Sequence, residues 1–319
     1  MMMDKKAQDL VEGFFNPMDL LDKNELFKRL RNMEPGNLFD VMESIRRDEI
    51  KKLRETGFWE SNLQHIHQNL KHFDMENVFP KDQLVEFIQY LMSTSSLWPA
   101  YFMIMSHDDR FISEHVTIRN IEYLDQALID GNGAILGQLH WGPFQLLFPL
   151  LVKLGYPIFQ LFGEKDAEIW AVDMIKAYFP ENLWSNFKTA TVPESGFLVK
   201  ALKALKRNSF VALPLEVNGS DILPRQTLQF LGNEIYAPDG SASIAAITKS
   251  PIILVRVEAV RDQVEIIFDE PIYIHHKKDV AEVNKRIFNK MEYHIKENPL
   301  QWRGWAFLEE MVVQKEMSK

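Results

Sequence analysis

The amino-acid sequence predicts an α/β fold in which helices cover both faces of a mainly parallel sheet, preceded by an N-terminal helical region. From about residue 117, short apolar runs alternate with segments of helical periodicity, as is typical of parallel strands joined by crossover helices. Residues 1 to about 100 instead carry apolar residues at three- and four-residue spacing, with few β-branched runs. We therefore expect a helical region at residues 1–110 and an α/β domain at residues 111–319.

The N-terminal region contains four segments of helical periodicity, at residues 20–33, 37–56, 59–73 and 81–92. The third segment carries three histidines, of which His65 and His72 share a helical face while His67 points elsewhere. No carboxylate completes this set at the spacing of metal ligands. We therefore expect no metal site.

In the α/β region we expect helices at residues 121–129, 144–154, 168–179, 194–206, 241–248 and 280–298, and strands at 134–139, 158–162, 209–213, 251–258 and 263–268. A polar loop at residues 216–225 follows the third of these strands. The unit at residues 134–162 is a βαβ crossover, which places the turn after its first strand at the carboxyl edge of the sheet. Open α/β sheets bind their ligands at this edge.

Composition excludes several classes of function. The chain has 319 residues and no cysteine, so disulfides, a thiolate nucleophile, a zinc–thiolate site and an iron–sulfur cluster are excluded. The net charge is −9 and the basic residues are scattered, so we do not expect nucleic acid as a partner. Residues 1–15 contain no apolar run long enough for a signal peptide or an anchor. We expect a cytoplasmic protein with at most peripheral membrane contact.

His140 is the strongest candidate for chemistry, because it follows the strand at residues 134–139 directly and precedes a helix. Gly142 permits a close backbone approach to a ligand, and amides at the helix start near Pro143 could stabilise a developing oxyanion. The alternative is a buried histidine that is satisfied by a neighbouring carbonyl group. The position favours a catalytic imidazole.

Several segments together resemble a known family. They are the GNGAILGQLH run at residues 131–140, the VKALKALK run at 199–206, the FLG and PDGSA pieces within 230–242, and the PLQWRGW run at 299–305. The likeness is to the lysophospholipid acyltransferase superfamily, closest to the bacterial lipid A lauroyl/myristoyl acyltransferases, and spans roughly residues 37–308. It implies acyl transfer from an acyl-carrier-protein or CoA thioester, with no bound cofactor, to a hydroxyl or amine of a small or carrier-bound acceptor.

The chain departs from this family at the position that should hold the acidic partner of the histidine. The family pattern has Asp or Glu there, and this chain has Gln145. Glutamine can hold the imidazole tautomer but cannot stabilise an imidazolium by charge, and the comparable change in serine proteases costs about 10⁴ in rate. Glu216 and Asp221 are the candidate substitutes, because parallel topology could bring their loop beside His140.

The resemblance also suggests further binding residues. We expect the oxyanion and the substrate to be bound by Trp141, Gly142, Phe144, Asp221, Phe230 and Gly232. The basic residues Lys200, Lys203, Lys206 and Arg207 are a possible docking patch for an acidic carrier protein, although a solvated helix face explains them as well. The apolar stretch at residues 97–105 could line an acyl tunnel or touch a membrane surface, with core packing as the simpler explanation.

Two other functions remain open on this scaffold. A thioesterase would use water as the acceptor, and a non-catalytic acyl-binding protein would account for Gln145. A serine hydrolase is not favoured, because the Gly-x-Ser-x-Gly pattern is missing. A nucleotide-binding enzyme is not favoured either, since neither a P-loop nor a dinucleotide glycine fingerprint is present.

Overall fold

The computed structural model describes residues 58–72, 110–163, 165–216, 225–260 and 263–313, with five isolated residues between positions 44 and 55. Helix α4 (Phe58–His72) confirms the helix expected at residues 59–73. The helices expected at 20–33 and 81–92, most of that at 37–56, and the apolar stretch at 97–105 lie outside the described residues.

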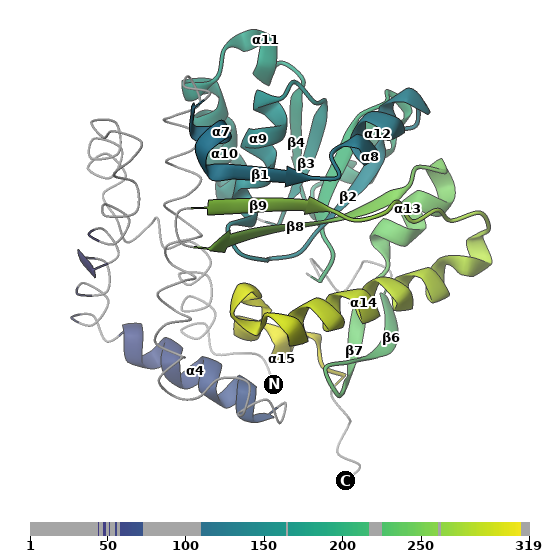
Figure 1. Cartoon of the computed structure of the whole chain (residues 1–319). Coiled ribbons are helices and arrows are strands. Elements are labelled where there is room, and N and C mark those ends of the chain that lie inside the picture. The colour runs from purple at the N-terminus through teal and green to yellow at the C-terminus, as the bar shows by residue number, and fades with distance from the viewer. Residues whose placement is uncertain are drawn as a thin grey trace.

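A seven-stranded sheet forms the centre of the α/β region (Figure 1). Its strands lie in the order β1 (Val116–Arg119), β9 (Gln263–Phe268), β8 (Ile252–Val260), β2 (Ala134–Gln138), β5 (Phe210–Pro214), β3 (Ile158–Phe162) and β4 (Phe187–Thr191). Every neighbouring pair is parallel except β8 and β9, which are antiparallel. A separate antiparallel hairpin consists of β6 (Arg225–Phe230) and β7 (Asn233–Pro238). The sheet confirms the mainly parallel α/β fold.

Helices cover both faces of the sheet, as the sequence predicts. Successive residues of β2 point to opposite faces, so Leu136 joins one apolar core and Ile135 the other. The α9 face, named after its central helix, is covered by α8 (Glu122–Ile129), α9 (Leu147–Lys153) and α10 (Lys165–Tyr178). The α14 face is covered by α12 (Phe197–Lys206), α13 (Gly240–Thr248) and α14 (Val280–Glu297). In Figure 1, α14 passes below the sheet with the hairpin beneath it.

The remaining described helices are short. They are α7 (Arg110–His115), α11 (Glu181–Trp184), α15 (Leu308–Met311) and the 3₁₀ turns Phe144–Leu146, Lys277–Asp279, Pro299–Gln301 and Arg303–Ala306. The first of these 3₁₀ turns precedes α9, so the helix expected at residues 144–154 is confirmed with a tighter first turn.

The sequence interpretation assigned no strand to the hairpin of β6 and β7, and in the seven-stranded sheet it missed β1 and β4. Both lie at the ends of the sheet, and each alternates more and less exposed positions instead of forming a continuous apolar run. Edge strands need not be apolar on both sides, so they lack the signal that identifies a buried central strand.

Parallel pairing brings two loops together at the carboxyl edge of the sheet. Gln138 at the end of β2 pairs with Pro214 at the end of β5. His140 and Glu216 each follow two residues later, so both lie just beyond the same edge. A chain segment at residues 299–307, here called the closing segment, also pairs there, with a bridge between Trp141 and Trp302.

Candidate active site

The centre of the site is a contact between His140 and Glu216. The Nδ1 atom of His140 lies 3.1 Å from Oε1 of Glu216, and the same oxygen accepts a hydrogen bond from the His140 backbone N–H at 2.6 Å. The Glu216 side chain is 0% exposed and that of His140 is 13% exposed. The carboxyl group is therefore buried, while the imidazole reaches the surface of the site.

This contact determines which nitrogen of His140 carries the proton. An ionised carboxylate only accepts hydrogen bonds, so the ring nitrogen that faces Glu216 is the donor. Nδ1 then carries the hydrogen, and Nε2 carries the lone pair. This is the tautomer that a general base requires.

Two aromatic rings pack against the imidazole. The ring centroids of His140 and Phe144 are 4.6 Å apart, and those of His140 and Phe307 are 5.7 Å apart, both edge to face. Phe144 also contacts the Arg303 guanidinium, which lies 5.4 Å from its ring centroid. The surroundings of the histidine are thus largely apolar, which strengthens its interaction with a buried carboxylate. Sequence reasoning selected Phe144 but missed Phe307 and Arg303.

The acidic partner of His140 comes from Glu216 and not from position 145. The side-chain oxygen of Gln145 is buried and has no hydrogen-bond partner among the described residues. Glu216, at the end of β5, supplies the carboxylate that the residue five positions after His140 would have supplied. Asp221, the other candidate, lies outside the described residues.

One backbone amide of the expected oxyanion site is hydrogen-bonded within the protein. The backbone N–H of Gly142 donates to the Gln301 carbonyl at 2.7 Å, so this amide is already used. The bond belongs to the pairing of the closing segment with the His140 loop, in which the Arg303 N–H also donates to the His140 carbonyl at 2.8 Å. Gly142 has a φ of 52°, a turn conformation that favours glycine.

Trp141, Phe230 and Gly232 lie on the α14 side of the site or beyond it. Trp141 and Phe230 are buried in the core of that face, and Phe230 packs edge to face against Trp302. Trp302 in turn packs against Phe307, so Phe230 is separated from the imidazole by two intervening rings. Gly232 is exposed in the turn between β6 and β7, with a φ of 80° that explains the glycine.

The basic residues of the expected docking patch, Lys200, Lys203, Lys206 and Arg207, are all exposed on or next to α12. The end of α12 lies at the amino edge of the sheet, because the side chain of Asn208 accepts from the N–H of Gly133, just before β2. Lys206 and Arg207 therefore lie at the edge opposite His140. A carrier protein bound there would contact the far side of the domain.

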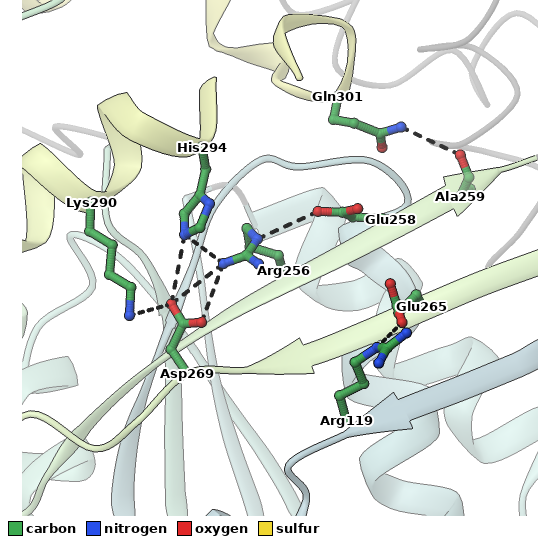
Figure 2. Close-up of polar contacts among 9 residues, drawn as sticks. All are labelled: Arg119, Arg256, Glu258, Ala259, Glu265, Asp269, Lys290, His294 and Gln301. Carbon is green, nitrogen blue, oxygen red and sulfur yellow. Dashed lines mark hydrogen bonds and ion pairs between the residues drawn. The ribbon is translucent and has the colours of Figure 1, made fainter. Parts of the chain in front are cut away.

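A second histidine–carboxylate contact lies on the α14 face (Figure 2). Arg256 of β8 donates to Asp269 at 3.3 Å and to Nε2 of His294 at 2.7 Å, and Lys290 lies 2.9 Å from Asp269. Burial, reinforced by the charge of Arg256, lowers the pKa of His294 to about 4. His294 is therefore neutral and accepts from arginine. Sequence reasoning missed this cluster, here called the Arg256 cluster.

Metal binding finds no support in the described part of the chain. No group of three or more His, Asp or Glu side chains there could hold a metal ion. Within the same residues, no helix has the length and apolar character needed to cross a membrane.

Comparison with protein families gives a match over most of the chain. No curated protein matches the chain. The family model described as bacterial lipid A biosynthesis acyltransferase matches residues 60–305, which include most of α4, His140, Glu216 and most of the closing segment. Because this match covers most of the chain, the protein belongs to the bacterial lipid A biosynthesis acyltransferase family.

Proposed function

We propose that the protein is an active acyltransferase in which His140 is the general base and Glu216 orients it. The donor is an acyl thioester of acyl carrier protein or CoA from the cytoplasm, and the acceptor is a hydroxyl or amine on a small or carrier-bound molecule. The observation that carries the proposal is the 3.1 Å contact between Nδ1 of His140 and the buried Glu216 carboxylate.

The proposed reaction needs no covalent enzyme intermediate. Nε2 of His140 removes the proton of the acceptor as its oxygen or nitrogen attacks the thioester carbonyl carbon. The carbon–sulfur bond then breaks, and the imidazolium returns the proton to the departing thiolate. Glu216 stabilises the imidazolium between these two steps, and its burial strengthens that interaction.

The contact between Glu216 and His140 removes the main argument for a non-catalytic acyl-binding role. That alternative depended on Gln145 being the partner of the imidazole, and Glu216 occupies that place. Thioester hydrolysis by the same base stays open, because water could take the place of the acceptor.

The test is thiol release from dodecanoyl-CoA or the dodecanoyl carrier protein, with and without acceptors. The chain has no cysteine, so a thiol-specific reagent reports only the released carrier or CoA thiol. His140→Ala should abolish the release, whereas His294→Gln, which changes the other histidine beside a carboxylate, should retain it. Undiminished release by His140→Ala would overturn the proposed base.

A further inference from the structure

A row of polar side chains crosses the α9 face of the sheet beside the proposed base. Gln138 of β2 lies two residues before His140, so the alternation of the strand points it to the α9 face, where Leu136 lies. Gln160 of β3 reaches across β5, and its amide donates to the Gln138 side-chain oxygen at 3.2 Å. Gln160 pairs in turn with Thr189 of β4. This set is called the glutamine row below.

The glutamine row is buried and incompletely satisfied. Gln138 and Gln160 are each 5% exposed, in a core that is otherwise apolar on this face. The Gln160 amide nitrogen donates to Gln138 and to the Leu161 carbonyl, but its oxygen has no hydrogen-bond partner among the described residues. A buried acceptor without a donor is costly to maintain, and such groups in native proteins usually have a functional reason.

Two more buried acceptors without partners belong to the carboxyl edge of the sheet. Oε2 of Glu216 and the side-chain oxygen of Gln145 share this condition with Gln160 among the described residues. Glu216 follows β5, and Gln145 lies in the 3₁₀ turn Phe144–Leu146 that follows the His140 loop. All three atoms are hydrogen-bond acceptors. A ligand that satisfied them would have to bring donors, such as hydroxyl or amino groups.

The charges along the row disfavour an anion. Glu168, at the far end, accepts from Thr189 at 2.6 Å, from Thr191 at 2.5 Å and from Lys165 at 2.5 Å. Burial alone would raise the pKa of Glu168, but the hydrogen bonds from Lys165, Thr189 and Thr191 hold it below the usual range. The charge of Lys165 is thus compensated. The charge of Glu168 is compensated by the same pair, which leaves the buried Glu216 carboxylate as the charge that would repel a phosphate beside His140.

We propose that the glutamine row binds the acceptor, and that the acceptor is a neutral or cationic hydrogen-bond donor, such as a polyol or an amino alcohol, rather than a phosphate ester. The proposal rests on the acyltransferase function proposed above for the position of the reacting group. It goes beyond that function by assigning a binding site and a chemical class to the acceptor. Gln160 is the central residue of this binding site, since its buried side-chain oxygen has no hydrogen-bond donor among the described residues.

The test uses three acceptors that share a three-carbon skeleton and differ in charge: 3-amino-1,2-propanediol, glycerol and sn-glycerol 3-phosphate. Each is added to dodecanoyl-CoA or the dodecanoyl carrier protein, and acceptor-dependent thiol release is compared with hydrolysis. We expect kcat/KM for the amino compound and for glycerol to exceed that for the phosphate by about tenfold or more, the scale of one charge-assisted contact. Equal or higher use of the phosphate would overturn the proposal.

Gln160→Met keeps the length of the side chain and removes the acceptor oxygen. It should raise KM for glycerol about tenfold relative to the native protein. The control is Gln226→Leu on the β6 hairpin, which also removes a buried side-chain oxygen without a partner in the described residues. An unchanged KM in folded Gln160→Met would refute the role of Gln160. If that variant fails to fold, Gln160→Glu carries the test, and it should increase the preference for the amino compound over glycerol.

Binding can be separated from chemistry with His140→Ala. Thermal unfolding of this variant with each of the three compounds should show stabilisation by the amino compound and by glycerol but not by the phosphate. If the three compounds stabilise His140→Ala in this order but the native protein transfers no acyl group, the binding site is supported and the proposed function is rejected. If acyl transfer depends on His140 but does not depend on the charge of the acceptor, the proposed function is supported and the binding site is rejected.

Discussion

Two histidines lie beside carboxylates in different parts of the domain, His140 at the carboxyl edge of the sheet and His294 on its α14 face, and their surroundings differ in one decisive respect. Glu216 lies 3.1 Å from His140, and its Oε2 has no partner among the described residues. Asp269, 4.0 Å from His294, is shared with Arg256 and Lys290 (Figure 2). The Glu216 carboxylate can therefore stabilise a positive charge on its histidine, whereas the Asp269 carboxylate already pairs with two permanent cations.

The difference teaches how to tell a reactive pair from a structural one. Nε2 of His294 accepts from an arginine, so this nitrogen cannot also take a substrate proton. In His140 the carboxylate occupies Nδ1, and the lone pair is on the other nitrogen. Proximity of a carboxylate is therefore a weak criterion by itself. The number of other cations on that carboxylate, and which ring nitrogen it faces, separate the two cases.

The largest expected effect comes from Glu216→Gln, which keeps the shape of the side chain and removes its charge. We expect kcat for acyl transfer to fall by about 10³- to 10⁴-fold, because the imidazolium loses its counter-charge. Steady-state thiol release measures this, with circular dichroism as the check of folding. A fall of less than about tenfold would show that another group stabilises the imidazolium.

Asp269→Asn should have the opposite profile, with a large effect on stability and little on catalysis. Arg256 and Lys290 would lose their shared counter-charge in a mostly buried place, which should lower the free energy of unfolding by about 3 kcal/mol. Urea denaturation measures the loss. If Asp269→Asn instead abolished thiol release while the protein stayed folded, the assignment of the Arg256 cluster as structural would be wrong.

His294 should make stability depend on pH. Its pKa falls from an ordinary value of 6.5 to about 4, so between these values the unfolded chain binds a proton that the folded chain excludes. The stabilisation is complete above pH 6.5 and is lost as the pH falls toward 4. We expect a loss of about 2 kcal/mol between about pH 7 and pH 5.

His294→Gln should remove this contribution and flatten the pH dependence of urea denaturation in that range. The matched comparison is the wild-type protein under the same conditions. Parallel curves for the two proteins would show that other groups cause the acid sensitivity.

The smallest effect is expected from Gln145→Glu, which restores the acidic residue of the family pattern. Glu216 already contacts Nδ1 of His140, so a carboxylate at position 145 would find that ring nitrogen occupied. We therefore expect kcat to change by less than about threefold. Steady-state kinetics with the same thioester measures the change. A gain of about a hundredfold or more would identify position 145, and not Glu216, as the natural partner.

Much of the fold followed from periodicity. Strands β3 and β9 begin and end where the apolar runs predict, and His140 lies at the carboxyl edge as expected. Glu216 could be named only as one of two candidates, because strand pairing determines which loop residue reaches the histidine. The Arg256 cluster depends on contacts between β8, β9 and α14 that no local pattern encodes.

Two signals in the sequence were available but went unused. Gln138 and Gln160 are polar residues inside otherwise apolar strands, where an unpaired amide is unfavourable. Such residues indicate a partner or a ligand, although the sequence alone cannot tell which. The hydrogen bond from the Gly142 amide to Gln301 could not be predicted from the sequence, because no motif joins residues so distant along the chain.

The pairing of the closing segment with the His140 loop has a consequence for biosynthesis. Residues 301 and 303 hold the backbone on both sides of Trp141, and Phe307 supplies one wall of the imidazole. These residues leave the ribosome more than 150 positions after His140. A nascent chain that already contains the whole sheet therefore still lacks a finished site, and we expect premature termination before Trp302 to give a product without the proposed acyl-transfer activity.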